Sequence, residues 1–232
     1  MMIEARDVVY SYPNRVDALK GVSFHLESSR KYALVGANGA GKSTLLSLLC
    51  ALEYPQGGTI QIGGLPLDKA HTQQIRDTVG MVFQNPDDQL FMPTVYDDVA
   101  FSLRNRGRQE SDIAPQVDAL LDEMGISHLK DRPPYRLSGG EKRIAAIATA
   151  LSMKPKMLLM DEPTAFLDPR ARNHFISLIR RLDIGILIAT HDLRLAREHM
   201  DGVLVLKEGR IFAQGEAALL DDPQLLQSAL LA

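Results

Sequence analysis

A glycine-rich loop between two apolar segments constrains this chain more than any other feature. Residues 36–44 read Gly-Ala-Asn-Gly-Ala-Gly-Lys-Ser-Thr and fit the pattern G-x-x-x-x-G-K-[S/T]. The apolar run Ala33 to Val35 precedes the loop, and a leucine-rich segment that ends at Leu52 follows it. A strand, a glycine-rich turn and a helix in this order direct backbone N–H groups at phosphate oxygens. The pattern therefore predicts a loop that binds a nucleoside triphosphate.

The side chains of this loop have separate predicted roles. Lys42 would place a positive charge on the β- and γ-phosphates, Ser43 would ligate Mg²⁺, and Thr44 would add a phosphate contact. The other expected contacts come from Gly36, Asn38, Gly39, Ala40 and Gly41. A nucleotide or small-molecule kinase would share this loop, so the loop alone does not define the reaction.

Two carboxylates follow the apolar run Met157 to Met160. Asp161 and Glu162 would stand at the end of a buried strand, where ligands bind in α/β sheets. Asp161 is suited to hold the Mg²⁺ shell through water, and Glu162 to polarise the water that attacks the γ-phosphate. A solvated turn before Pro163 is the simpler interpretation of the pair alone. Together with the phosphate loop, the pair favours an enzyme that hydrolyses its nucleotide.

The order of strand-like and helix-like segments predicts an α/β fold with a helical insert. Strand-like runs separated by Gly-Gly turns dominate residues 2–84, and the patterning of residues 85–154 is helical. Beyond residue 157, short apolar runs alternate with helices, which is typical of a parallel sheet covered on both faces. The predicted strands cover residues 5–10, 21–26, 32–35, 59–62, 79–83, 157–160, 184–189 and 203–206. The later predicted helices cover residues 112–124, 170–181 and 193–199.

The composition limits the partners. Lys and Arg number 26 against 29 Asp and Glu, a net charge of −3. This argues against nucleic-acid binding, because contacts with that backbone need a basic face that releases counterions. We expect the basic residues Arg104, Arg106 and Arg108 to lie on a solvated loop or helix end. Cys50 is the only cysteine and the N-terminal residues do not resemble a secretion signal, so we expect a cytoplasmic chain.

Another glycine-containing motif lies in residues 137–143, which read Leu-Ser-Gly-Gly-Glu-Lys-Arg. Ser138 and the glycines would open a helix whose N-terminus attracts an anion. An ordinary capped helix with Glu141 in its first turn is the simpler interpretation. The segment resembles the signature motif of the ATPase domains of ABC transporters. The resemblance implies that Ser138, Gly139, Gly140 and Glu141 reach the ATP held by a second, head-to-tail ATPase subunit.

Other motifs follow in the order that the resemblance implies. Tyr12 resembles the aromatic residue that stacks on adenine, with Tyr10 as the competing candidate. Gln84 resembles the glutamine that completes the Mg²⁺ shell and senses the transmembrane partner. Asp168 matches the aspartate that couples the two sites across the dimer. His191 resembles the histidine that hydrogen-bonds the γ-phosphate.

The resemblance also implies cofactors and catalytic groups. ATP would be the nucleotide, with Mg²⁺ held by Ser43, Gln84 and, through water, Asp161. The catalytic group would consist of Glu162, His191 and Lys42.

The resemblance covers residues 12 to about 215 and has two departures. Arg30 and Lys31 stand where the family usually has a glycine and an acidic residue, at an expected surface turn. Phe166 stands where the family usually has a small residue, so we expect altered packing across the dimer near Asp168.

The segment Gln84 to Phe101 is similar to that of ATPase subunits of energy-coupling-factor importers, which take up cobalt, nickel and vitamins. Its apolar residues are Leu90, Phe91, Val95, Val99 and Phe101, and its carboxylates are Asp87, Asp88, Asp97 and Asp98. Such a segment suits a groove for a helix of a membrane subunit, although packing between subdomains would give the same pattern. The short sequence after Gly215 favours the cobalt or nickel systems by analogy. Since no His or Cys cluster is evident, we do not expect the transported ion to bind here.

We therefore predict an ATP hydrolase that powers an importer of the energy-coupling-factor type, for cobalt ions. The alternatives are a nickel or vitamin importer, the ATPase of another ABC transporter class and, remotely, a soluble ABC ATPase of translation or DNA repair. Residues 1–232 would form one ABC ATPase domain. Residues 1–84 and 155–232 would build a P-loop NTPase core of the RecA-like type with an antiparallel β subdomain, and residues 85–154 a helical signature subdomain.

The expected partners follow from this prediction. The chain would form a head-to-tail homodimer and bind transmembrane subunits through Gln84 to Phe101, without binding nucleic acid. Its apolar runs are far shorter than the ~18 residues that span a bilayer. We therefore expect a peripheral protein on the cytoplasmic side of the cell membrane.

Overall fold

The computed structural model describes residues 2–13, 17–27, 29–165 and 167–229. The chain divides into two compact units. Unit 1 comprises Met1–Val79, Lys156–Glu162 and Asp183–Ala232, and unit 2 comprises Gly80–Pro155 and Pro163–Leu182. Phe166, one of the two departures from the family pattern, lies outside the described residues.

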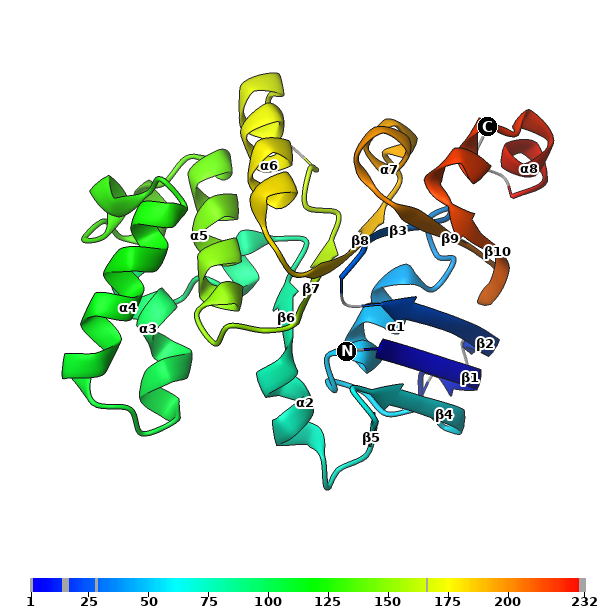
Figure 1. Cartoon of the computed structure of the whole chain (residues 1–232), viewed down its shortest axis with the longest axis horizontal. Helices are drawn as coiled ribbons and strands as arrows, with labels where there is room; N and C mark the ends of the chain where they lie inside the picture. Colours follow the sequence, from blue (N-terminus) through cyan, green and yellow to red (C-terminus); the bar gives the residue numbers. More distant parts are fainter. Residues whose placement is uncertain (1, 14–16, 28, 166, 230–232) are drawn as a thin grey trace. The chain divides into compact units, whose positions relative to one another are not determined.

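An antiparallel sheet belongs to unit 1. Its strands are β1 (Met2–Ser11), β2 (Asp17–Glu27), β4 (Gly57–Ile62) and β5 (Leu65–Pro66). They pair in the order β2-β1-β4-β5, and Figure 1 shows β1, β2 and β4 side by side. Buried and exposed residues alternate along β2, as expected for a sheet with one face toward the interior. The predicted antiparallel sheet is confirmed.

The second sheet of unit 1 is mainly parallel. Its strands are β3 (Lys31–Val35), β7 (Met157–Asp161), β8 (Gly185–Thr190), β9 (Gly202–Lys207) and β10 (Arg210–Glu216). They run in the order β10-β9-β3-β8-β7, with only β10 antiparallel to its neighbour. Every residue of β7 and β8 is buried, because their continuous apolar runs form the interior of the sheet. The predicted parallel sheet is also confirmed.

The helices of unit 1 are α1 (Lys42–Leu49), α2 (Thr72–Thr78), α7 (Leu193–His199) and α8 (Pro223–Ser228), with a 3₁₀ turn, η4 (Ala217–Asp221). The prediction extended α1 to Leu52, but Ala51 has a φ of 55°, which a right-handed helix cannot contain. Sequence patterning missed α2 and α8. Among their described residues only Ile75 is fully buried, so apolar spacing gave no signal.

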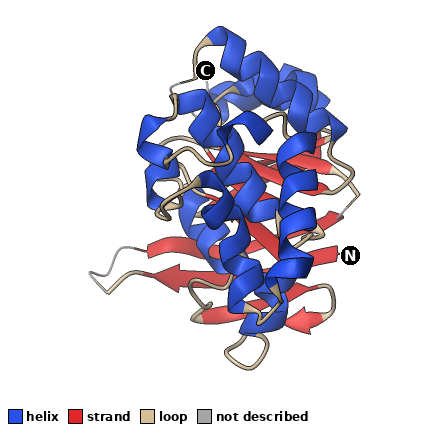
Figure 2. Cartoon of the chain, turned by 90° about the vertical axis from the view of Figure 1, so that its left-hand side faces the viewer, coloured by secondary structure: helices blue, strands red, loops and turns tan. Residues whose placement is uncertain are grey.

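Unit 2 is mainly helical. The strand β6 (Val79–Val82) leads into α3 (Val95–Asn105), α4 (Glu110–Glu123), α5 (Gly139–Leu151) and α6 (Pro169–Arg181). Three 3₁₀ turns lie between them: η1 (Pro86–Asp88), η2 (Ser127–Leu129) and η3 (Pro134–Arg136). Helix α3 packs against α4 and α5, and α5 packs against α6. Figure 2 shows the helices of the chain in blue and its strands in red.

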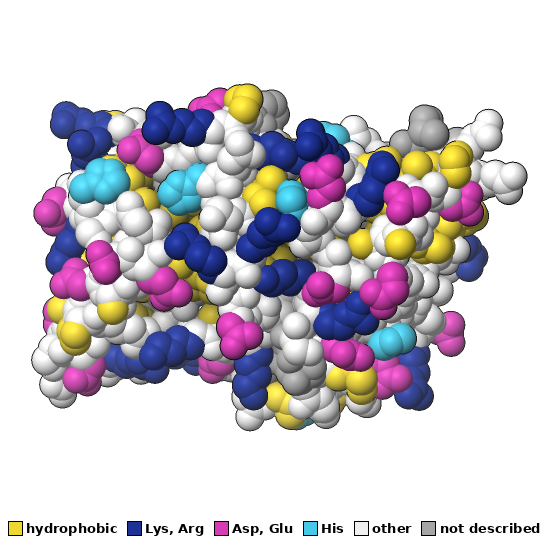
Figure 3. All heavy atoms as spheres, turned by 45° about the horizontal axis from the view of Figure 1, so that its top comes forward, with side chains coloured by type: hydrophobic (Ala, Val, Ile, Leu, Met, Phe, Trp, Pro, Cys, Tyr) yellow, Lys and Arg dark blue, Asp and Glu magenta, His cyan; other side chains and the backbone are white. Residues whose placement is uncertain are grey.

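Burial and charge agree with the sequence analysis. Aliphatic side chains such as Leu34, Leu45 and Ile188 are fully buried in unit 1. On the face shown in Figure 3, lysine and arginine side chains are interspersed with aspartate and glutamate. Within the described ranges, no helix combines the length and the apolar character needed to cross a bilayer.

Candidate active site

The phosphate loop joins β3 to α1 and is shaped by glycines. A Cβ added to Gly36 would lie 2.3 Å from the carbonyl oxygen of Leu206, so only glycine fits against β9. Gly41 has a φ of 107° and also lies close to β2, where an added Cβ would be 2.6 Å from the carbonyl oxygen of Ala18. The two defining glycines of the pattern are therefore required by the packing of the loop on its own unit.

The residues of the loop divide by exposure. Asn38, Gly39 and Ser43 are exposed, whereas Ala40 is buried. Because the exposed residues lie at the loop and at the first turn of α1, the loop presents backbone and hydroxyl groups to a ligand.

Lys42 and Thr44 are buried in the first turn of α1, and their polar atoms have partners. The Nζ atom of Lys42 donates to the carbonyl oxygens of Gly36 (2.7 Å) and Ala37 (3.3 Å). The hydroxyl groups of Thr44 and Tyr12 are 3.1 Å apart. Backbone carbonyl groups of the loop thus fix the ammonium group of Lys42, and Thr44 contacts Tyr12.

Glu162 is a buried carboxylate of unit 1 that lies between Lys42 and His191. Its residue is 8% exposed, and its Oε1 lies 4.0 Å from the Nζ atom of Lys42. Its Oε2 lies 2.9 Å from Nδ1 of His191 and accepts the backbone N–H of His191 at 3.4 Å. The imidazole is largely exposed, with 70% of its side chain accessible. A carboxylate held between a buried ammonium group and an exposed imidazole is placed to accept a proton from water.

The backbone of Glu162 is strained. Its φ is 42°, in the left-handed region that non-glycine residues rarely adopt. The N–H group of Glu162 donates to the carbonyl oxygen of Ala189 at 2.8 Å and fixes this conformation beside β8. Strain of this kind costs on the order of 1–3 kcal/mol and is concentrated at functional sites.

Two oxygen donors of unit 1 fit a magnesium ion. Ser43 presents an exposed hydroxyl in the first turn of α1, and Asp161, 7% exposed, ends β7, which α1 contacts. Hydroxyl, carboxylate and water oxygens are the ligands that Mg²⁺ prefers. The third predicted ligand, Gln84, is exposed and lies in unit 2.

The structure distinguishes the two adenine-stacking candidates by exposure. Tyr10 is 5% exposed and Tyr12 is 37% exposed, with their rings 5.2 Å apart in an edge-to-face arrangement. Burial and a hydrogen bond with Glu53 raise the pKa of Tyr10 to about 12. Both rings line a cavity of about 760 Å³. Tyr12 is the ring that can present a face to a ligand.

The predicted signature residues begin helix α5 in unit 2. The hydroxyl of Ser138 accepts the backbone N–H of Glu141 at 3.3 Å. The Oε2 atom of Glu141 in turn accepts the backbone N–H of Ser138 at 2.7 Å and its hydroxyl at 2.8 Å. These reciprocal bonds form a capping box and lower the pKa of Glu141.

Asp168 performs the same capping role for α6. Its Oδ1 accepts the backbone N–H groups of Arg170 (2.8 Å) and Ala171 (2.9 Å). Ser138 and Asp168 line one cavity of about 650 Å³. The structure therefore brings the signature residues and Asp168 together within unit 2.

Two residues that the sequence analysis missed hold the segment around Gln84. Arg143 is 2% exposed and donates to the carbonyl oxygens of Phe83 (2.7 Å) and Gln84 (2.6 Å). The side-chain amide of Gln89 donates to the carbonyl oxygen of Ala146 at 2.7 Å. A charged residue directly before the apolar run of α5 was the available signal for Arg143. No local pattern indicated Gln89.

The strand, phosphate loop and helix of unit 1, with a lysine and a carboxylate in contact, define a P-loop NTPase. The ABC transporter family matches residues 19–165 of this chain. The chain therefore belongs to the ABC transporter family of ATPases, and it binds and hydrolyses ATP.

Individual relatives agree with this assignment. A Geobacter sulfurreducens protein named as an ABC transporter ATP-binding protein is 47% identical over 92% of this chain and 86% of its own length. The energy-coupling factor transporter ATP-binding protein EcfA of Methanosphaera stadtmanae is 40% identical over 98% of this chain and 84% of its own length. The structure of CbiO1 from Clostridium perfringens, part of the ABC transporter complex CbiONQ, has a TM-score of 0.86. It is 37% identical and covers 97% of this chain and 92% of its own.

Proposed function

We propose that this chain is the ATPase subunit of an importer of the energy-coupling-factor type and that the transported ion is cobalt. The names of EcfA and of the CbiONQ complex support the type of importer. The observation that carries the proposal is an aromatic pair in the segment Gln84 to Phe101, of which Phe91 is exposed and Phe101 is half-buried. Phe91 is 63% exposed, and its ring meets that of Phe101 edge-to-face at 5.0 Å. Aromatic residues are enriched at protein interfaces, so an exposed aromatic residue on a fixed surface favours a docking role.

A buried carboxylate holds Phe91 in place. Asp98 is 4% exposed, and its Oδ1 accepts the backbone N–H groups of Phe91 and Met92, both at 3.0 Å. Burial raises the pKa of Asp98. Two N–H donors on one carboxylate oxygen fix the backbone under the exposed ring, which supports a preformed docking surface.

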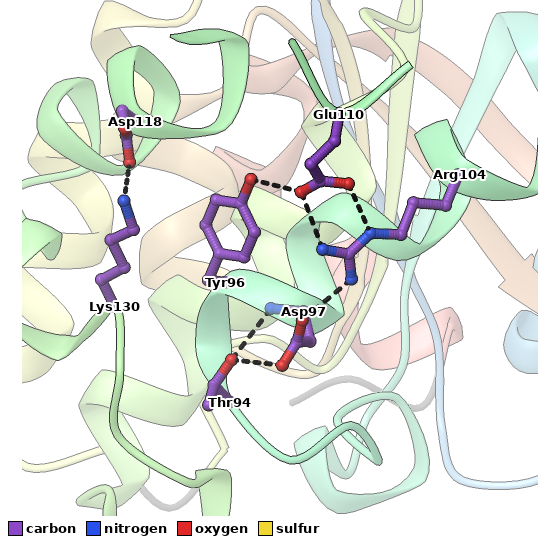
Figure 4. A network of polar contacts seen from close by, with 7 residues as sticks. All are labelled: Thr94, Tyr96, Asp97, Arg104, Glu110, Asp118 and Lys130. Atoms are coloured by element: carbon purple, nitrogen blue, oxygen red, sulfur yellow. Dashed lines mark hydrogen bonds and ion pairs between the residues drawn. The ribbon is translucent and has the colours of Figure 1, made fainter. Parts of the chain in front are cut away.

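A polar network braces the helix that carries Phe101 (Figure 4). Arg104, in the last turn of α3, donates to Asp97 at 2.8 Å and to both carboxylate oxygens of Glu110, at 2.8 and 3.0 Å. The hydroxyl of Tyr96 donates to Glu110 at 2.7 Å. These donors lower the pKa of Glu110 to about 2. The network joins α3 to the first turn of α4 and supports a rigid surface.

ATP binding and hydrolysis would drive two states of a head-to-tail homodimer. Two ATP molecules would close the dimer, closure would push a helix of the membrane subunit, and hydrolysis at Glu162 would reopen it. The contacts with the partner's ATP would come from Ser138, Gly139, Gly140, Glu141 and Asp168. The bonds from Arg143 to the backbone of Phe83 and Gln84 support transmission between the docking segment and the signature helix.

The remaining assignments are part of the same proposal. Mg²⁺ would be held by Ser43, Gln84 and, through water, Asp161, and would balance the charge on the phosphates. Residues 85–154 would form the helical subdomain. The transported ion would bind to the membrane partners, and the chain would lie peripherally on the cytoplasmic side of the membrane.

Uptake of radiolabelled cobalt tests this function. Cells would carry the chain or its Glu162→Gln form with its native membrane partners, and unlabelled nickel would be the competitor. We expect uptake that is lost in the variant and resists nickel. Strong competition by nickel would assign the importer to nickel. Uptake that does not depend on Glu162 would refute the metal importer.

A second assay tests the docking surface. Phe91→Ala should abolish co-purification with the membrane partners while ATP binding by the isolated chain stays unchanged. Phe212→Ala is the matched control, because Phe212 is also exposed (45%) but lies on β10 in unit 1. Equal co-purification of both variants would contradict the proposed surface.

A further inference from the structure

The first turns of α5 and α6 approach each other at one pair of small residues in unit 2. A Cβ added to Gly140 would lie 2.9 Å from the Cβ of Ala171, closer than two carbon atoms can pack. Apart from Gly140 itself, its two chain neighbours and the backbone of its own helix, no other described atom lies within 4 Å of that position. Counted in the same way, an added Cβ at the neighbouring Gly139 would meet no described atom within 4 Å. The two glycines of the signature therefore have different surroundings.

Ala171 also belongs to the cap of α6. Its backbone N–H donates to the Oδ1 of Asp168 at 2.9 Å. Ser138, Gly140, Asp168 and Ala171 all line the same cavity of about 650 Å³. The contact between Gly140 and Ala171 thus lies beside the capping residues of two helices and limits how closely the two helix ends can approach.

A methyl group at this contact would separate the two helices. Carbon atoms in contact prefer a separation of about 3.5–4.0 Å, so a pair at 2.9 Å must move apart by about 0.6–1.1 Å. A misplacement of about 1 Å is enough to cost on the order of 100-fold in rate when it moves a group that contacts reacting atoms.

We propose that Ala171 is a positioning residue for ATP hydrolysis. Its small side chain lets the first turn of α6 lie against Gly140, so that Ser138 and Asp168 keep one fixed spacing. Gly140 is needed for this contact within one chain, whereas a side chain at Gly139 would meet nothing within the chain and would only take space from the proposed ligand. The inference rests on the proposed role of Ser138 at the partner's ATP.

A rescue experiment tests the inference. ATP hydrolysis by the full chain in its transporter would be compared for Gly140→Ala, Ala171→Gly and the double variant. We expect Gly140→Ala to lower kcat by on the order of 10- to 100-fold. Ala171→Gly alone should lower kcat far less than Gly140→Ala does, because it creates no clash, and the double variant should recover most of the kcat that Gly140→Ala loses. ATP affinity should not change in any of them, because the phosphate loop is intact.

Enlarging the other side of the contact gives an independent test. Ala171→Val should lower kcat as Gly140→Ala does, although residue 171 lies outside every recognised motif. Gly139→Ala is the matched control. Because an added Cβ at Gly139 does not meet Ala171, the further change Ala171→Gly should not restore the activity of Gly139→Ala. Thermal unfolding of each variant separates loss of kcat from loss of fold.

The possible outcomes separate this inference from the proposed function. If Ser138→Ala keeps full activity, the signature role itself is wrong. If Ser138→Ala is inactive and the double variant is as slow as Gly140→Ala, the positioning role of Ala171 is wrong and the signature role stands. Normal activity of Gly140→Ala or of Ala171→Val would also overturn the inference.

Discussion

The N-terminal turns of α1 and α5 both carry residues predicted to bind ATP, but they satisfy their backbone N–H groups differently. Helix α1 begins after Gly41, with no side-chain cap and no acidic residue in its first turn. Helix α5 begins after Ser138 and has a complete capping box with Glu141. One helix presents its donors to an outside anion, whereas the other already supplies acceptors from its own side chains.

This difference indicates that the two helix ends contribute differently to ATP binding. A phosphate at α1 would meet backbone N–H donors that no side chain caps. It would also meet the buried positive charge of Lys42. A phosphate at α5 meets a helix end that is already stable without a ligand. We infer that the phosphate loop provides most of the ATP affinity and that the signature turn contributes after ATP has bound elsewhere.

Glu162→Gln has the largest expected effect. The amide keeps the shape of the side chain but cannot accept a proton from water, so hydrolysis should fall by about 10²- to 10⁴-fold. ATP binding should stay intact, and a closed dimer should accumulate. Rapid-quench measurement of the hydrolysis step checks this, and turnover equal to that of the wild type would remove Glu162 from the chemistry.

Lys42→Ala should affect binding more than any change at the signature turn. Loss of a hydrogen-bonded charge costs about 1.5–3 kcal/mol, or about 10- to 100-fold in ATP affinity. Ser138→Ala is the comparison at α5 and should leave the affinity of the isolated chain unchanged. Calorimetric titration with ATP would measure both, and equal losses would contradict the difference between the two helix ends.

Tyr12→Ala should weaken ATP binding through loss of stacking, by about 1–3 kcal/mol. Tyr12→Phe keeps the ring and loses only the contact with Thr44, so it should bind ATP with nearly the wild-type affinity. Comparison of ATP with inorganic triphosphate identifies the base as the partner. If Tyr12→Ala weakened triphosphate binding equally, stacking would not be the cause.

Glu141→Ala has the smallest expected effect and tests the cap of α5. Loss of a capping interaction costs about 1 kcal/mol of unfolding free energy at pH 7. The folded-state pKa of Glu141 is lowered, so its stabilisation is present above the ordinary pKa of 4.5 and is lost as pH falls through the folded-state value. The difference in stability between wild type and variant should therefore shrink in acid. Urea unfolding between pH 3 and pH 7 checks this, and a constant difference would refute the charged cap.

The features predicted well from the sequence are those that local chemistry determines. The glycines of the phosphate loop require a particular backbone, and the apolar runs that became β7 and β8 require burial, so the fold class and the ATPase family followed. The end of α1 was misplaced because the left-handed conformation of Ala51 leaves no residue signature. Arg143 and Gln89 were missed because their partners are distant in sequence.

The central proposal is that the signature turn of one chain contacts the ATP held by the phosphate loop of a second chain, and mixing two variants tests it directly. Ser138→Ala and Lys42→Ala chains, each inactive alone, would be mixed and assembled with the membrane partners before ATP hydrolysis is measured. In a head-to-tail dimer, half of the randomly formed pairs have one intact site, so activity should return above that of either variant alone, up to about a quarter of the wild-type rate when one intact site turns over by itself. If the signature turn served the ATP of its own chain, each mixed pair would have two damaged sites and the mixture would stay inactive.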